Sequence, residues 1–162
     1  MATQLFDACS NGNVEEAKQL LQNPEINPNW QDNLGYTPFY VACRNGHIEI
    51  VKLLLNDKSI DVNKASHNNA TPFYIACFKE NINVVKLLLA SGREVDLNIK
   101  NRDGKTAIDI AKEYKKNNVV ELIETFQKNQ SETREKLRKE FGLSGNNNYS
   151  RSYYYYYYFT LK

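Results

Sequence analysis

The apolar positions of this chain follow a pattern that returns, nearly unchanged, after 34 residues. The stretches YTPFYVACRNG at 36–46 and ATPFYIACFKE at 70–80 are each followed by VKLLL, at 51–55 and 85–89. Apolar residues recur at helical spacing in these stretches, and each Thr-Pro offers a hydroxyl at the N-cap with proline at the first helical position. Each copy therefore predicts a short first helix and then a second helix, which runs from about 47 to 56 in the first of the two copies.

Glycine and asparagine separate the predicted helices. Gly46 offers a left-handed turn between the first and second helix. Polar, Asn-rich links such as IDVNKASHNNA at 60–70 predict turns or short extended hairpins between copies. Glu80 stands where Gly46 stands one copy earlier, which predicts a reshaped turn or a strained backbone. Asn69 replaces the link glycine seen at Gly35, and asparagine tolerates that conformation better than most residues do.

The period divides most of the chain into four units. A fixed period of this size is typical of a solenoid, in which neighbouring units stack because neither helix alone can bury its apolar face. In unit one, which is degenerate, Asn13 and Glu16 have the spacing of a capping box. The expected array spans residues 1–126, with units at about 1–31, 32–65, 66–100 and 101–126.

Composition and charge narrow the function classes. A 41% apolar and 25% charged composition is ordinary for a soluble globular protein. No run approaches the roughly 20 apolar residues of a membrane span, and the first residues do not resemble a signal peptide, so we expect a cytoplasmic or nuclear protein without membrane contact. Residues 1–126 carry 14 Lys and Arg against 16 Asp and Glu, whereas 127–162 carry 7 against 3. The slightly acidic body argues against nucleic acid as its partner.

Candidate chemistry is sparse. Cys9, Cys43 and Cys77 lie 34 residues apart, in register with the repeat, which favours a packing role over a metal site or a nucleophile. His47 and His67 have no partner motif, and the chain has no Gly-rich phosphate loop, H-E-x-x-H or G-x-S-x-G sequence. We therefore expect no enzymatic activity, no cofactor and no bound metal.

Taken together, three stretches make the chain resemble an ankyrin-repeat protein: 32–55, 69–89 and, as a terminal repeat, 101–123. The resemblance implies an all-α solenoid of stacked helix-turn-helix units, joined by short β-hairpin or turn links whose tips project to one side of a concave binding face. The chain departs from the family in having Phe39-Tyr40 and Phe73-Tyr74 where Leu-His is usual. The usual inter-repeat histidine bond must therefore be replaced or lost.

The resemblance also implies a contact surface, at the tips and on the exposed side of each first helix. Aromatic residues and arginine, which are enriched in binding hot spots, occur among these positions. The alternative is packing within the array, with Trp30 and Leu34 on the adjacent tip and Phe78 on the next helix. The predicted contacts are Trp30, Asn33, Leu34, Tyr36, Arg44, Asn45, Lys64, His67, Asn68, Ala70, Phe78, Lys79, Ile99, Arg102, Asp103, Lys105, Glu113 and Tyr114.

After residue 126 the repeat pattern stops. Residues 127–143 predict a marginal charged helix with Gly142 as its stop, either folded back over the last repeat or solvated. Residues 144–162 form an Asn- and Tyr-rich tail that we expect to be disordered, although self-association, phosphorylation or stacking on bases are alternatives.

These features predict a non-catalytic, monomeric module that binds a protein partner of unknown identity through the concave face and tips. Two alternatives stay open. One is binding of single-stranded RNA, assisted by the basic tail, and the other is a regulatory fragment of a larger enzyme.

Overall fold

The computed structural model describes residues 2–143, so the predictions for the tail at 144–162 lie outside the described residues. The described part of the chain forms nine α-helices and no strand, which confirms the predicted all-α class. The helices are α1 (Ala2–Asn11), α2 (Val14–Leu20), α3 (Pro38–Asn45), α4 (Ile48–Asn56), α5 (Pro72–Phe78), α6 (Ile82–Ala90), α7 (Ala107–Glu113), α8 (Asn117–Lys128) and α9 (Gln130–Glu140).

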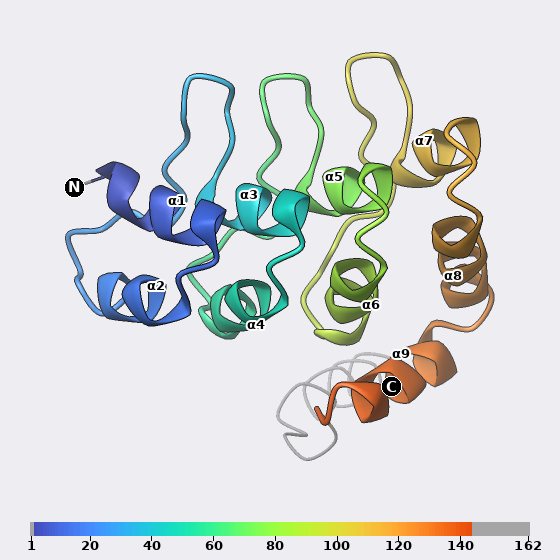
Figure 1. The fold of residues 1–162 in the computed structure, drawn as a ribbon. Helices are drawn as coiled ribbons and strands as arrows, with labels where there is room; N and C mark the ends of the chain where they lie inside the picture. Colours follow the sequence, from blue (N-terminus) through green and yellow to red (C-terminus); the bar gives the residue numbers. More distant parts are fainter. Residues whose placement is uncertain (1, 144–162) are drawn as a thin grey trace, which may run out of the picture.

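The first eight helices lie in two parallel rows (Figure 1). The first helices α1, α3, α5 and α7 form one row, in which each contacts the next, and the second helices α2, α4, α6 and α8 form the other. Each first helix also packs against the second helix that follows it. Three long links project beyond the row of first helices, all on the same side (Figure 1). The predicted solenoid of stacked helix pairs is confirmed.

Small residues allow the first helices to lie close together. Ala8, Ala42, Ala76 and Ala111 occupy the same position in successive first helices, and each is at most 1% exposed. The three cysteines that follow Ala8, Ala42 and Ala76 are fully buried as well. Larger side chains at these positions would hold neighbouring helices apart, so the repeated Ala-Cys pair is explained by packing.

Threonine hydroxyls begin three of the first helices. The Oγ1 atoms accept backbone N–H bonds three residues ahead, Thr37 from Tyr40 at 3.0 Å and Thr71 from Tyr74 at 3.1 Å. Thr106 caps α7 in the same way, and there the Asp109 carboxylate accepts the Thr106 backbone N–H at 2.9 Å, which completes a capping box.

The capping box predicted in unit one is wrong. Asn13 stands at the N-cap of α2, but its side chain accepts no cap bond. Its amide instead donates to the Glu16 carboxylate at 3.2 Å, so the two side chains pair with each other rather than with the backbone. The threonine-aspartate pair at the start of α7 forms both hydrogen bonds of a capping box, whereas the asparagine-glutamate pair at the start of α2 does not.

The turn between first and second helix has a left-handed residue in every unit. Gly12 and Gly46 both have φ of 77°, and the residues at the equivalent positions are Glu80 with φ of 58° and Lys115 with φ of 55°. The strained backbone predicted at Glu80 is confirmed. Lys115 repeats it in the last unit, where a non-glycine residue again adopts a conformation that costs L-residues roughly 1–2 kcal/mol.

The helix predicted after residue 126 folds back on the array. Helix α8 continues to Lys128, and α9 then turns and packs against α6 and α8 (Figure 1). Leu137 is only 4% exposed in this interface. Two arginines of α9 donate to the last carbonyls of α6, Arg134 to Leu89 O and Arg138 to Ala90 O, both at 3.2 Å. Of the two alternatives for this segment, the structure shows the packed one.

Among residues 2–143, no helix has both the length and the apolar character that crossing a bilayer demands.

Candidate partner-binding face

The three projecting links end in tight turns with the same hydrogen bonds. Of the two forms predicted for these links, turns or extended hairpins, the structure therefore shows turns. A backbone N–H at each tip donates to the carbonyl three residues earlier, at 2.8–3.0 Å. A second backbone bond closes the turn from the other side, as where Asp32 N–H donates to Tyr36 O at 3.1 Å. The tip bonds run from Gly35 to Asp32, from Asn69 to Ser66 and from Gly104 to Asn101.

Each tip is bonded directly to the next one. His67 N–H donates to Leu34 O, and Arg102 N–H donates to Asn68 O, both at 3.0 Å. Side-chain amides add further links, since Asn69 Nδ2 donates to Lys100 O at 2.7 Å. The tips are therefore tied into one row, and their side chains have a fixed spacing.

We define the tip face as the three tips, residues 32–36, 66–70 and 101–105, together with the ends of α3, α5 and α7. The exposed part of the predicted contact set on and beside this face is Asn33, Leu34, Arg44, Asn45, His67, Asn68, Lys79, Arg102, Asp103, Glu113 and Tyr114. The half-buried part is Trp30, Tyr36, Lys64, Phe78, Ile99 and Lys105.

Ala70 is 8% exposed and cannot present a contact surface, so its prediction as a contact residue is wrong. Ala70 belongs to the buried apolar core, whereas Tyr36 and Lys105 at the equivalent positions have longer side chains and are half-buried.

The four predicted contacts that are Trp, Tyr or Phe already have ring partners within the array. Trp30 meets Phe6 of α1 edge-on, with ring centroids 5.8 Å apart. Tyr36 stacks on Tyr40 at 4.4 Å. Phe78 packs edge-on against Tyr114 of the next unit at 5.0 Å, as the packing alternative predicted. Leu34 remains 57% exposed, so its side chain is open to a partner.

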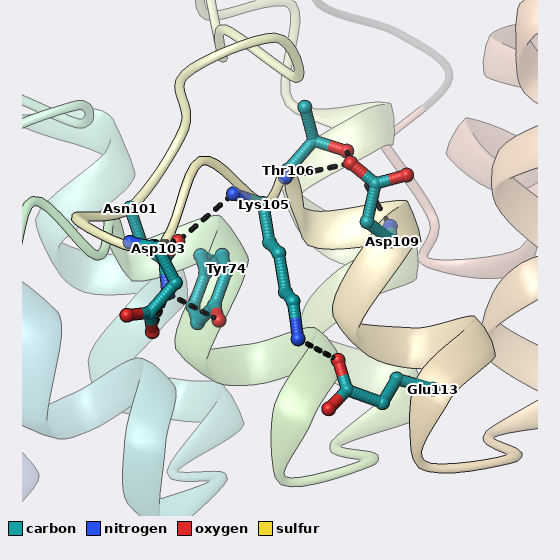
Figure 2. Close-up of polar contacts among 7 residues, drawn as sticks. All are labelled: Tyr74, Asn101, Asp103, Lys105, Thr106, Asp109 and Glu113. Atoms are coloured by element: carbon teal, nitrogen blue, oxygen red, sulfur yellow. Dashed lines mark hydrogen bonds and ion pairs between the residues drawn. The ribbon is translucent and has the colours of Figure 1, made fainter.

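Tyr40 and Tyr74, which stand where the family usually has histidine, each form a hydrogen bond between repeats. The sequence predicted that the histidine bond is replaced or lost, but it did not identify these tyrosines as the replacement. The Tyr74 hydroxyl accepts from Asn101 Nδ2 in the next tip at 3.0 Å (Figure 2). One unit earlier, Tyr40 has the same relation to Ser66 through a side-chain hydrogen bond. The Phe-Tyr pair that follows each Thr-Pro was the available signal, because it marks the departure from Leu-His.

The last tip has a network of charges around Tyr74. The Lys105 ammonium forms an ion pair with Glu113, while Asp103 accepts a bond from Asn101 Nδ2 at 3.2 Å (Figure 2). The bond to Glu113 raises the pKa of Lys105. Burial raises the pKa of Tyr74, and the charges of Asp103 and Glu113 raise it further. Both groups therefore stay protonated near neutral pH, and Tyr74 keeps its proton to donate.

The buried thiols are poor nucleophiles. Burial raises the pKa of Cys9 to about 12 and also raises the pKa values of Cys43 and Cys77. A thiol held in its neutral form inside a helix row has neither the charge nor the access that nucleophilic catalysis needs. In residues 2–143, no three or more His, Cys, Asp or Glu side chains come together in a group that could hold a metal ion.

The comparisons with known proteins agree with this geometry. A family model of ankyrin repeats in three copies matches residues 2–66, and a second, of ankyrin repeats in many copies, matches residues 53–111. The matched residues run from α1 into α7. A search of curated proteins found no match.

Proposed function

This chain belongs to the ankyrin-repeat family, and from that premise we propose that it is a non-catalytic module that binds a protein partner through its tip face. Ankyrin repeats are generally protein–protein interaction modules. The proposal names the surface of this chain that makes the contact.

The observation that carries the proposal is the direct bonding of one tip to the next. Leu34 O and Asn68 O each accept a backbone N–H from the following tip at 3.0 Å, so the exposed side chains between them do not move independently. Binding to a pre-ordered row costs less conformational entropy than binding to separate flexible loops. Rigid display of a varied row of side chains is what a recognition surface requires.

The proposal is tested by affinity capture with a variant that changes only exposed side chains. We expect the triple variant Leu34→Ala, His67→Ala and Arg102→Ala to lose proteins that the unchanged chain retains, because it removes exposed contact area on all three tips without opening the core. Trp30, Phe78 and Tyr114 are left intact because their rings pack within the array, Trp30 on Phe6 and Phe78 on Tyr114, and their loss would also change stability.

The matched control replaces three exposed residues of the second-helix row, Glu49, Asn83 and Glu121, by alanine. It should retain the same proteins as the unchanged chain, with circular dichroism showing that both variants fold. Equal retention by the tip-face variant and the control would place the contact elsewhere and contradict the proposal.

A further inference from the structure

The ends of neighbouring first helices have two aromatic rings and two cations at equivalent or adjacent repeat positions. Helices α3, α5 and α7 contact in sequence, and Arg44, Phe78 and Glu113 occupy the same repeat position at their ends. The next position has Asn45 in α3, Lys79 directly after α5 and Tyr114 directly after α7. We call Arg44, Phe78, Lys79 and Tyr114 the ring-cation patch.

The rings of this patch form a partly open apolar surface. Phe78 and Tyr114 meet edge-on with an interplanar angle of 83°, which holds both rings in place. Tyr114 is nevertheless 52% exposed, an unusual state for a large side chain with an apolar ring. The Lys79 ammonium lies over the Phe78 ring, 5.6 Å from its centroid, so the cation is held next to the exposed ring of Tyr114. An occupant therefore meets an aromatic ring and a positive charge side by side.

The acids nearest to the patch are already neutralised. Glu80, next to Lys79, pairs with Lys116 at 3.0 Å, and Glu113, next to Tyr114, pairs with Lys105. Within residues 2–143, Arg44 and Lys79 are exposed and belong to no ion pair. The patch therefore has a local positive charge, although residues 1–126 as a whole carry more acids than bases.

We infer that the ring-cation patch takes an acidic peptide segment of the partner, in which an aromatic or aliphatic side chain lies next to Asp or Glu. The inference rests on the proposed function and names the partner's chemistry. A carboxylate forms a charge-assisted, two-point bond with an arginine such as Arg44, and the neighbouring apolar side chain covers Phe78 and Tyr114.

A peptide fits this patch better than a nucleic acid does. A phosphate backbone would also contact Arg44 and Lys79, but its charges continue past them at regular intervals. Beyond the patch, Asp103 is exposed and residues 1–126 as a whole have a net negative charge, so the body repels a long polyanion. A short acidic segment contacts only the patch and does not extend over the rest of the body.

The test is fluorescence anisotropy of the full chain with a labelled peptide, Gly-Glu-Asp-Phe-Glu-Leu-Asp-Gly, at low salt. We expect saturable binding that weakens as salt rises, because exposed charges are screened. A peptide with Gln and Asn in place of the acids should bind at least about tenfold more weakly, and so should one with Ala in place of Phe and Leu.

The matched variants remove two positive charges each. Arg44→Gln with Lys79→Gln should weaken binding of the acidic peptide at least about fivefold, whereas Lys18→Gln with Lys128→Gln, on exposed residues of α2 and α8, should change it less than about twofold. Equal losses in the two variants would show a general charge effect and overturn the inference. Stronger binding of a labelled poly-uridine strand than of the peptide would overturn it as well.

Failure of this inference is distinguishable from failure of the proposed function. If the acidic peptide does not bind but the Leu34, His67 and Arg102 variant, which leaves the patch intact, still loses captured proteins, then the tip face binds a partner of different chemistry. If that variant loses nothing while the peptide still binds at Arg44 and Lys79, then the patch is a binding site and the row of tips is not.

Discussion

Single residues decide how well each turn of this array fits its backbone. The turn between first and second helix requires a positive φ in all four units, and only two of them have glycine there. Glu80 has a partial compensation, because its carboxylate pairs with Lys116 in the next unit at 3.0 Å. Lys115 is exposed, and no ion pair of its ammonium is present among residues 2–143, so its left-handed backbone is uncompensated.

Replacing Lys115 by glycine should therefore stabilise the protein. Removing the strain of a non-glycine residue at φ of 55° stabilises the folded state by about 1–2 kcal/mol. Part of this gain is lost because glycine has more conformational entropy in the unfolded chain. We expect the free energy of unfolding, measured by urea denaturation, to rise by about 0.5–1 kcal/mol. Lys115→Ala is the control, since it removes the same side chain and keeps the strain. A glycine variant no more stable than the alanine variant would show that the turn is not strained.

At the scale of one element, α9 shows how a very polar helix is held to a repeat array. Its buried side chains are few, with Leu137 and Thr133 facing α6 and α8. The remaining attachment is polar, since Arg134 and Arg138 bond the end of α6 and Lys86 of α6 pairs with Glu140 at 2.7 Å. The arginines satisfy carbonyls that the end of a helix otherwise leaves without a partner. Helix α9 therefore caps the C-terminal end of α6 as well as packing against it.

Leu137→Ala should loosen this helix without unfolding the array. Loss of a nearly buried leucine costs about 2–4 kcal/mol, and only the α9 interface depends on it. We expect faster amide hydrogen exchange throughout α9, while the amides of α3 and α4 keep their protection. Lys136→Ala, on the exposed side of the same helix, should leave all exchange rates nearly unchanged. Unchanged exchange in the Leu137 variant would mean that the arginine bonds alone hold α9.

At the scale of the whole molecule, stability depends on contacts between neighbouring units. Within their row, the first helices pack against the adjacent first helices, so an inner unit has two neighbouring units and the first unit has one. The alanines in these interfaces are buried, Ala76 fully and Ala8 to within 1%, and protein interiors are close-packed. A larger side chain must push helices apart, and its cost depends on how many neighbours can move.

Ala76→Leu should therefore destabilise the array more than Ala8→Leu does. Overpacking costs about 1–3 kcal/mol, and Ala76 lies between α3 and α7, whereas α1 has only α3 beside it and can shift outward. Urea denaturation of the two variants measures the difference. Equal destabilisation would contradict the view that the end unit is freer to adjust.

Interactions within a few residues of chain could be predicted before the structure was known. The Thr37 cap is an example, because it needs only a hydroxyl three residues before a backbone N–H. The departure at Glu80 was predicted for the same local reason, by comparison with Gly46. The Asn13 cap was predicted wrongly, because the spacing does not say whether Asn13 bonds the backbone or Glu16.

The sequence by itself determined the repeat, its register and the position of its helices, since these depend on periodicity, caps and turns that act along a short length of chain. Only the tertiary structure decided what crosses from one unit to the next, such as the bonds from Asn81 Nδ2 to Cys43 O and Arg44 O at 2.9 Å. It also decided that Trp30 packs on Phe6 and that Arg138 reaches Ala90. These partners are far apart in the chain, and which of several nearby groups they meet depends on how the units stack.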